Sequence, residues 1–105
     1  MSAKKQYQEL VNRLVTTHRL DVKVSKMYGM SVLTTGGRAF AGFWNDDLVV
    51  RLDRLEYAKA SGLKGSEPYV MKNGQLLPEW IRVPVLHVSH WRGLSEDARV
   101  YANQG

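Results

Sequence analysis

The chain contains no cysteine among its 105 residues. That absence excludes disulfide bonds, thiolate nucleophiles and zinc or iron–sulfur sites held by cysteine. Long apolar runs are also missing, because the longest one, residues 39–44, is far shorter than the ~20 residues that cross a bilayer. The first residues mix lysines with other polar side chains and form no signal-peptide core. We therefore expect a cytoplasmic protein without a membrane segment.

What remains is an ordinary globular composition. Hydrophobic residues make up 44% of the chain and charged residues 24%, which is typical of folded proteins and not of disordered ones. A chain of this length buries roughly two-thirds of its unfolded surface, enough for one modest core. The sequence shows no internal repeat or linker. We expect residues 1–105 to form a single domain.

The net charge of +5 is concentrated in the first part of the chain. Residues 1–40 hold seven bases against two acids, whereas residues 41–105 hold eight of each. Such an excess favours a surface that binds polyanions, although a solvated helix face produces the same pattern. Nucleic-acid binding is therefore the alternative function, and its candidate residues are Lys4, Lys5, Arg13, Arg19, Lys23, Lys26 and Arg38.

Periodicity in the first half predicts one helix followed by strands. Apolar residues from Tyr7 to His18 recur at helical spacing, which indicates an amphipathic helix over residues 3–19. Alternating valines and β-branched residues then favour strands, and the glycine pair at 36–37 favours a tight hairpin. The expected strands are residues 21–27, 31–35, 38–44 and 48–52.

The second half is predicted to contain two helices and one strand. Asp53 and Glu56 have the spacing of a capping box, so a helix is expected over residues 54–61. Residues 63–78 are expected to form a loop with a turn at 73–74. The last two elements are a strand over residues 80–83 and a final helix that starts at Ser89 or Ser95.

This order of elements predicts an α+β fold. It runs helix, four strands, helix, strand, helix, and tight turns between consecutive strands imply an antiparallel sheet. Helices at both termini and one in the middle complete a two-layer domain.

Candidate catalytic and metal-binding residues do not form a recognisable set. Asp46 and Asp47 are adjacent, so on an extended chain they point to opposite faces, and both residue types favour tight turns. His87 and His90 could share a helix face, but no third ligand is placed near them. The glycines lack a phosphate-loop context, and the serines lack a nucleophile elbow. We predict no enzyme activity, no catalytic residues, no metal and no cofactor.

The hairpin over residues 38–52 predicts a second apolar sheet face. With a three-residue loop, the face opposite the main core carries Phe43, Val49 and Arg51 together with two alanines. With a two-residue loop, that face carries Val49 and Arg51 with two other aromatic residues. A sheet covered by helices on one side normally has a polar outer face. We therefore predict that Phe43, Val49 and Arg51 contact a protein partner or a second copy in a homodimer.

Several segments resemble the TfoX N-terminal domain family. They are KMYG at 26–29, GRAFAGFW at 37–44 and DLVVRL at 47–52, with looser similarity at 67–69 and 77–83. The resemblance covers residues 5–103. Met30 departs from the pattern, since the family often has a second glycine there, and no second domain follows as in the full competence regulators.

The resemblance implies a secretion-chaperone-like α+β domain that stands alone. The family takes its name from bacterial regulators of natural competence that act on transcription, and it provides no catalytic residues to transfer. From the residues and the resemblance together we expect a small non-enzymatic bacterial interaction domain. It would act through protein contacts and would be linked to competence or transcription regulation.

Overall fold

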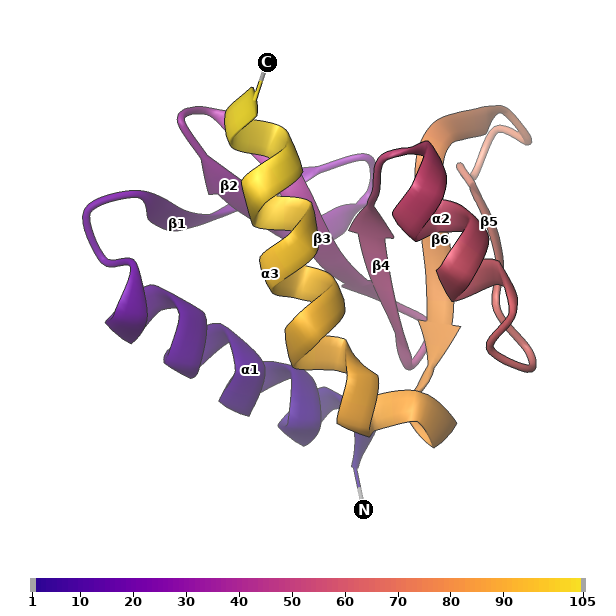
Figure 1. Ribbon diagram of the computed structural model, residues 1–105, viewed down its shortest axis with the longest axis horizontal. Coiled ribbons are helices and arrows are strands. Elements are labelled where there is room, and N and C mark those ends of the chain that lie inside the picture. Colours follow the sequence, from indigo (N-terminus) through magenta and orange to yellow (C-terminus); the bar gives the residue numbers. More distant parts are fainter. Residues whose placement is uncertain (1, 105) are drawn as a thin grey trace.

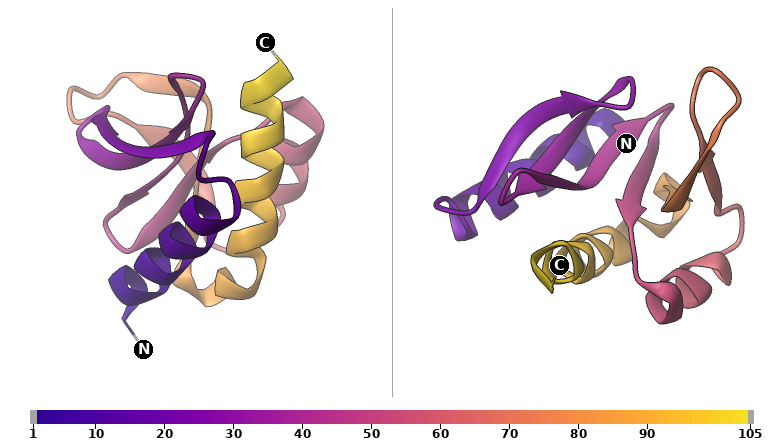
Figure 2. Two further views of the ribbon diagram at one scale, coloured as in Figure 1. Left: turned by 90° about the vertical axis from the view of Figure 1, so that its left-hand side faces the viewer. Right: turned by 90° about the horizontal axis from the view of Figure 1, so that it is seen from above.

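The protein folds into two layers, a six-stranded antiparallel sheet and three α-helices (Figure 1). The computed structural model describes residues 2–104. Strand order in the sheet is β1-β2-β3-β4-β6-β5, and Figure 2 shows the three helices on one side of it. The elements are α1 (Ala3–Thr17), β1 (Val22–Met27), β2 (Met30–Thr35), β3 (Arg38–Trp44), β4 (Asp47–Arg51), α2 (Arg54–Ser61), β5 (Glu67–Val70), β6 (Leu76–Pro84), the 3₁₀-helix η1 (Val85–His87) and α3 (Val88–Gln104).

The α+β class and its antiparallel sheet agree with the prediction, but the sheet has one more strand than expected. Both β5 and the start of β6 lie in the segment predicted to be a loop, residues 63–78. Gly74, with a φ of 85°, provides the expected turn between them. Pro68 is tolerated because β5 is the edge strand, where a missing N–H leaves no ladder bond unmade.

The final helix begins earlier than Ser89. The chain leaves β6 at Pro84, makes the short helix η1 and enters α3 at Val88. Trp91 fixes this corner, because its indole Nε1 donates to the carbonyl oxygen of Pro84 at 3.2 Å. From there α3 crosses β3 and β4, as Figure 1 shows. None of the helices in the described part of the chain is long and apolar enough to cross a bilayer.

The hairpin between β3 and β4 has a two-residue loop. Trp44 pairs with Asp47, and the intervening Asn45 and Asp46 have φ angles of 51° and 67°. Two consecutive left-handed residues define the type I′ turn that suits the twist of a hairpin. This register pairs Phe43 with Leu48, so both side chains lie on the helix-covered face.

A β-bulge in β3 changes the face on which its first residues lie. Leu33 pairs with Ala41 but Thr34 pairs with Ala39, which leaves Phe40 as an extra residue. Phe40 is fully buried in the main core beneath the helices, whereas Ala39 lies on the opposite face. The largest other side chains buried in this main core are Trp91, Leu14, Leu33, Leu48, Leu52 and Ile81.

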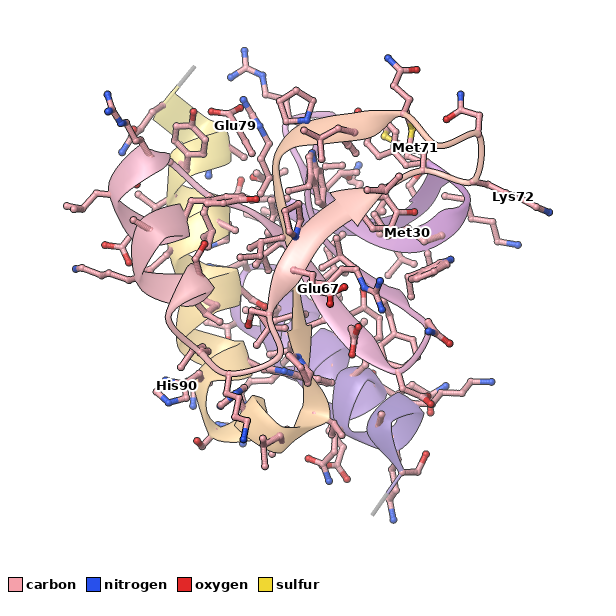
Figure 3. The ribbon with its side chains drawn as sticks, turned by 90° about the vertical axis from the view of Figure 1, so that its right-hand side faces the viewer. Met30, Glu67, Met71, Lys72, Glu79 and His90 are labelled. Carbon is pink, nitrogen blue, oxygen red and sulfur yellow. The ribbon has the colours of Figure 1, made fainter. Side chains whose placement is uncertain are left out.

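The opposite face of the sheet carries a second, smaller core. Figure 2 shows the sheet curled, so that the β1–β2 and β5–β6 hairpins rise on the side away from the helices. Tyr69 of β5 closes the gap by donating its hydroxyl to the carbonyl oxygen of Tyr28 at 2.9 Å. Met71 packs against this core and lies on the same side of the molecule as Met30 (Figure 3). The buried residues of this second core are Met30, Val32, Ala39, Val49, Tyr69 and Trp80.

Substituting alanine for Gly93 is expected to stabilise the protein. Gly93 lies inside α3, and a Cβ added there would meet no atom within 4 Å. Alanine lowers the conformational entropy of the unfolded chain and favours the helix, so the free energy of unfolding should rise by about 1 kcal/mol. Urea denaturation monitored by circular dichroism measures this change.

A matched control is Gly42→Ala in β3. Its Cβ would lie 2.8 Å from the Met30 sulfur and 3.0 Å from the Ser31 carbonyl oxygen, so this variant should be less stable than the parent. A Gly93→Ala variant that lost stability would contradict the prediction.

Candidate binding groove between α1 and β1

The three residues predicted to form a partner face do not share an exposed surface. Phe43 lies on the helix side, where its ring stacks on Tyr7 with centroids 5.0 Å apart. Val49 is 0% exposed in the second core. Arg51 forms an ion pair with Glu79 at 3.0 Å. The apolar second face is covered by the chain's own strands, which corrects the expectation that a partner must cover it.

The seven basic residues of the first part of the chain lie mainly around α1 and β1. Six of them belong to α1, to β1 or to the turn between the two. The exception, Arg38 at the start of β3, donates to the carbonyl oxygen of Ala102 at 3.1 Å. Lys23 and Lys26 have opposite parity in β1, so they point to opposite faces of the sheet. Positive charge therefore surrounds this edge of the protein without forming a compact patch.

An open groove of about 390 Å³ lies between α1 and the adjoining strands. Tyr7 and Val11 of α1 form one wall, and Val24 of β1 and Phe43 of β3 form the other. No acidic residue lines it within the described part of the chain. The polar lining residues are Lys4, Gln8, Asn12 and Ser31.

The hydroxyl of Tyr7 has no hydrogen-bond partner among the described residues. The side chain is only 5% exposed, because Phe43 stacks on its ring. Burial raises the pKa of the Tyr7 phenol, so the group stays neutral at physiological pH. A buried hydroxyl without a partner costs about 1–3 kcal/mol, so the Tyr7 hydroxyl destabilises the fold.

Tyr7→Phe is expected to raise the free energy of unfolding by about 1 kcal/mol, since it removes the unpartnered hydroxyl and keeps the stacked ring. Thermal or urea unfolding measures the change. Tyr69→Phe is the matched control, because the Tyr69 hydroxyl is bonded to Tyr28 and its removal should lower stability. If Tyr7→Phe lowered the free energy of unfolding as much as Tyr69→Phe does, the Tyr7 hydroxyl would have a hydrogen-bond partner in solution.

The outer edge of β1 runs beside the groove and pairs with no other strand in the described chain. Tyr28 and Gly29, with φ angles of 56° and 77°, form a type I′ turn, so the flanking Met27 and Met30 make the first hydrogen-bonded pair with β2. Hydrogen-bonded and non-hydrogen-bonded pairs alternate along an antiparallel ladder.

This alternation directs the backbone N–H and C=O groups of residues 24 and 26 away from β2. The N–H of Val22 has the same parity, and it donates to the His18 carbonyl oxygen at 2.8 Å instead of to β2. The edge next to the groove therefore offers unpaired backbone donors and acceptors.

The residues considered for catalysis or metal binding have structural contacts. Asp47 forms an ion pair with Arg82 at 2.8 Å, while Asp46 lies in the hairpin turn. A nitrogen of His87 lies 2.8 Å from the carbonyl oxygen of Lys64. Across residues 2–104, no three histidine, aspartate or glutamate side chains are close enough to hold a metal ion.

Glu79 was not singled out from the sequence, yet it has an unusual backbone. Its φ of 73° is left-handed, and it follows Pro78 within β6. Its carboxylate accepts hydrogen bonds from Arg51 and from the Tyr101 hydroxyl. The bond to Glu79 is the main cause of a raised pKa at Tyr101. These contacts connect β4, β6 and α3, so they support a structural role for Glu79.

The groove itself was missed in the sequence. Tyr7 and Val11 were assigned to the apolar stripe of the first helix, and Val24 to a strand alternation. Basic and apolar residues alternate in β1 at Val22, Lys23 and Val24, but they do not alternate in α1, so the sequence pattern did not indicate a groove between the two elements. Comparison with protein-family models finds no match for this chain, and comparison with curated proteins finds no similar sequence.

Proposed function

We propose that this chain is a small non-catalytic binding domain whose groove between α1 and β1 receives a protein partner. The observation that carries the proposal is a coincidence of three features. The groove has apolar side chains from both α1 and the strands, it contains Lys4 and no acid among the described residues, and it adjoins the free edge of β1. Together these features suit an amphipathic, negatively charged protein segment.

A protein partner fits the groove better than a nucleic acid does. Proteins that bind single strands present aromatic rings on which bases stack. The aromatic rings of this groove, Tyr7 and Phe43, instead stack on each other. The bases around α1 and β1 still make nucleic acid the second candidate, and the experiment below separates the two.

The resemblance to the TfoX N-terminal domain family adds a regulatory role to the proposal. Its segments at 37–44 and 47–52 form β3 and β4, with the turn between them, in the centre of the sheet, which is where a scaffold shared by a family would lie. On that basis we propose a bacterial interaction domain linked to competence or transcription regulation. A second copy of the chain is one protein that could occupy the groove.

The test is site-specific photo-crosslinking in the native cell. A photoreactive amino acid replaces Gln8, which is exposed and lines the groove, and in a control it replaces Val100 on α3, which is 46% exposed. A discrete protein adduct is expected from position 8 and not from position 100. Adding Val24→Asp, at a position 59% exposed, should abolish that adduct without unfolding the protein.

The nature of the adduct decides between the candidates. An adduct that nuclease removes would replace the protein partner with nucleic acid, and an adduct at twice the mass of the chain would identify a second copy. Equal adducts from positions 8 and 100, or none from either, would overturn the groove as the binding site.

A further inference from the structure

We infer that the partner segment binds as an extended acidic strand, added to the outer edge of β1 with alternate apolar side chains in the groove. This inference rests on the proposed function, because it assumes that a protein occupies the groove. It goes further by naming the conformation of the bound segment, its charge and the backbone groups that recognise it.

The backbone of β1 provides the first argument. Val24 and Lys26 direct their N–H and C=O groups outward, and their spacing of two residues is the repeat at which an added strand makes its bonds. Strand addition obtains affinity from these main-chain bonds and specificity from pockets for alternate side chains. The free edge of β1 can make the main-chain bonds, and the adjoining groove can receive the alternate side chains.

The side chains of β1 provide the second argument. Val24 pairs with Leu33 and Lys26 pairs with Ser31, so both lie on the helix-covered face of the sheet. Residues of an added strand that lie opposite Val24 and Lys26 share that face. Their side chains would therefore enter the space between β1 and α1, where Val11 and Val24 offer apolar contact.

The lysines provide the third argument, because they determine the charge of the segment. Lys26 lies on the groove side of β1, Lys23 lies on the opposite face, and Lys4 lines the groove from α1. Lysines on an edge strand prevent a sheet from pairing with its own copies. An added strand whose apolar side chains enter the groove directs its alternate side chains to the opposite face, where Lys23 lies, so carboxylates are favoured at those alternate positions.

The probe is a nine-residue acetylated peptide in which valine alternates with glutamate. It should bind the full chain, and fluorescence anisotropy measures the affinity. Val24→Pro removes one outward N–H while β1 keeps its bonds to β2, because proline is tolerated at an edge. We expect this variant to bind the peptide about tenfold more weakly than Val24→Thr, which has a similar branched side chain and keeps the N–H.

Two further measurements keep the test independent of how well the proline variant folds. Amide hydrogen exchange should show new protection at residues 24 and 26 when the peptide is bound. A peptide N-methylated at alternate residues, which cannot pair along one edge, should lose binding, and a peptide with lysine in place of glutamate should bind more weakly.

The outcomes separate this inference from the proposed function. Binding that is lost in Val24→Asp but unchanged in Val24→Pro and by N-methylation would overturn strand addition and leave the groove as the site, as a helical partner would require. A peptide that fails to bind while the crosslink from position 8 persists also overturns the inference alone. Loss of both peptide binding and crosslink overturns the two together.

Discussion

Val49→Asp is expected to unfold the protein. Val49 is fully buried in the second core, and Arg82, which lies opposite it in β6, already forms an ion pair with Asp47 at 2.8 Å. An unpaired carboxylate in such a site costs several kcal/mol, which is comparable with the total stability of about 5–15 kcal/mol of a typical domain. Far-ultraviolet circular dichroism and the loss of a cooperative urea transition would report the effect.

The same variant distinguishes the two interpretations of this sheet face. On a face left open for a partner, an aspartate would keep the fold and disrupt only assembly. On a face covered by β5 and β6, it prevents folding. Val24→Asp, at a position 59% exposed, is the matched control and should unfold like the parent. A Val49→Asp variant with a normal unfolding transition would show that the second core opens readily.

Strands joined by tight turns could be predicted because their signals are local. Residues 38–44 were expected as a strand and β3 has those bounds, and residues 54–61 were expected as a helix and α2 has those bounds. Each is set by β-branched content, a capping residue or a glycine turn within a few positions. The register of the β3–β4 hairpin stayed open, because it depends on the backbone angles of Asn45 and Asp46 and not on composition alone.

Long-range features were not predictable in this way. Pro68 and Pro78 made residues 63–78 resemble a loop, and only the position of β5 at the edge of the sheet makes a proline acceptable there. A two-residue hairpin loop alone would place Phe40 on the second face of the sheet, but the β-bulge places this ring in the main core. The covering of Val49 depends on Tyr69 reaching Tyr28 across 41 positions of sequence. No period or propensity contains that information.

The candidate groove illustrates the same limit. A helical stripe containing Tyr7 and Val11 predicts burial against a sheet, but not where along the sheet the helix lies. In the structure α1 leaves Val24 of β1 59% exposed, and the groove is the result. The charge excess of residues 1–40 was visible in the sequence. That this positive charge lies on both sides of a groove could be seen only in the folded structure.

Trp91→Ala is the second large effect that we expect. Trp91 is a residue of α3 and is 1% exposed. Its ring lies edge-on to Phe43 with the ring centroids 6.5 Å apart, and its bond to Pro84 holds the β6–α3 corner. Truncating a buried tryptophan removes apolar burial and leaves a cavity, so the free energy of unfolding should fall by about 3–5 kcal/mol. Urea denaturation followed by circular dichroism measures the loss.

The variant also tests how the groove is supported. Phe43 lies between Trp91 and Tyr7, so removal of the indole should let Phe43 move and weaken binding of the acidic peptide in molecules that remain folded. Leu86→Ala is the control, because Leu86 is 72% exposed in η1 and its truncation should change stability by less than about 0.5 kcal/mol. If Trp91→Ala lowered the free energy of unfolding as little as Leu86→Ala does, the packing of the helices on the sheet would not depend on the β6–α3 corner. If it lowered stability but left peptide binding unchanged in the folded fraction, Phe43 would be held by Tyr7 alone.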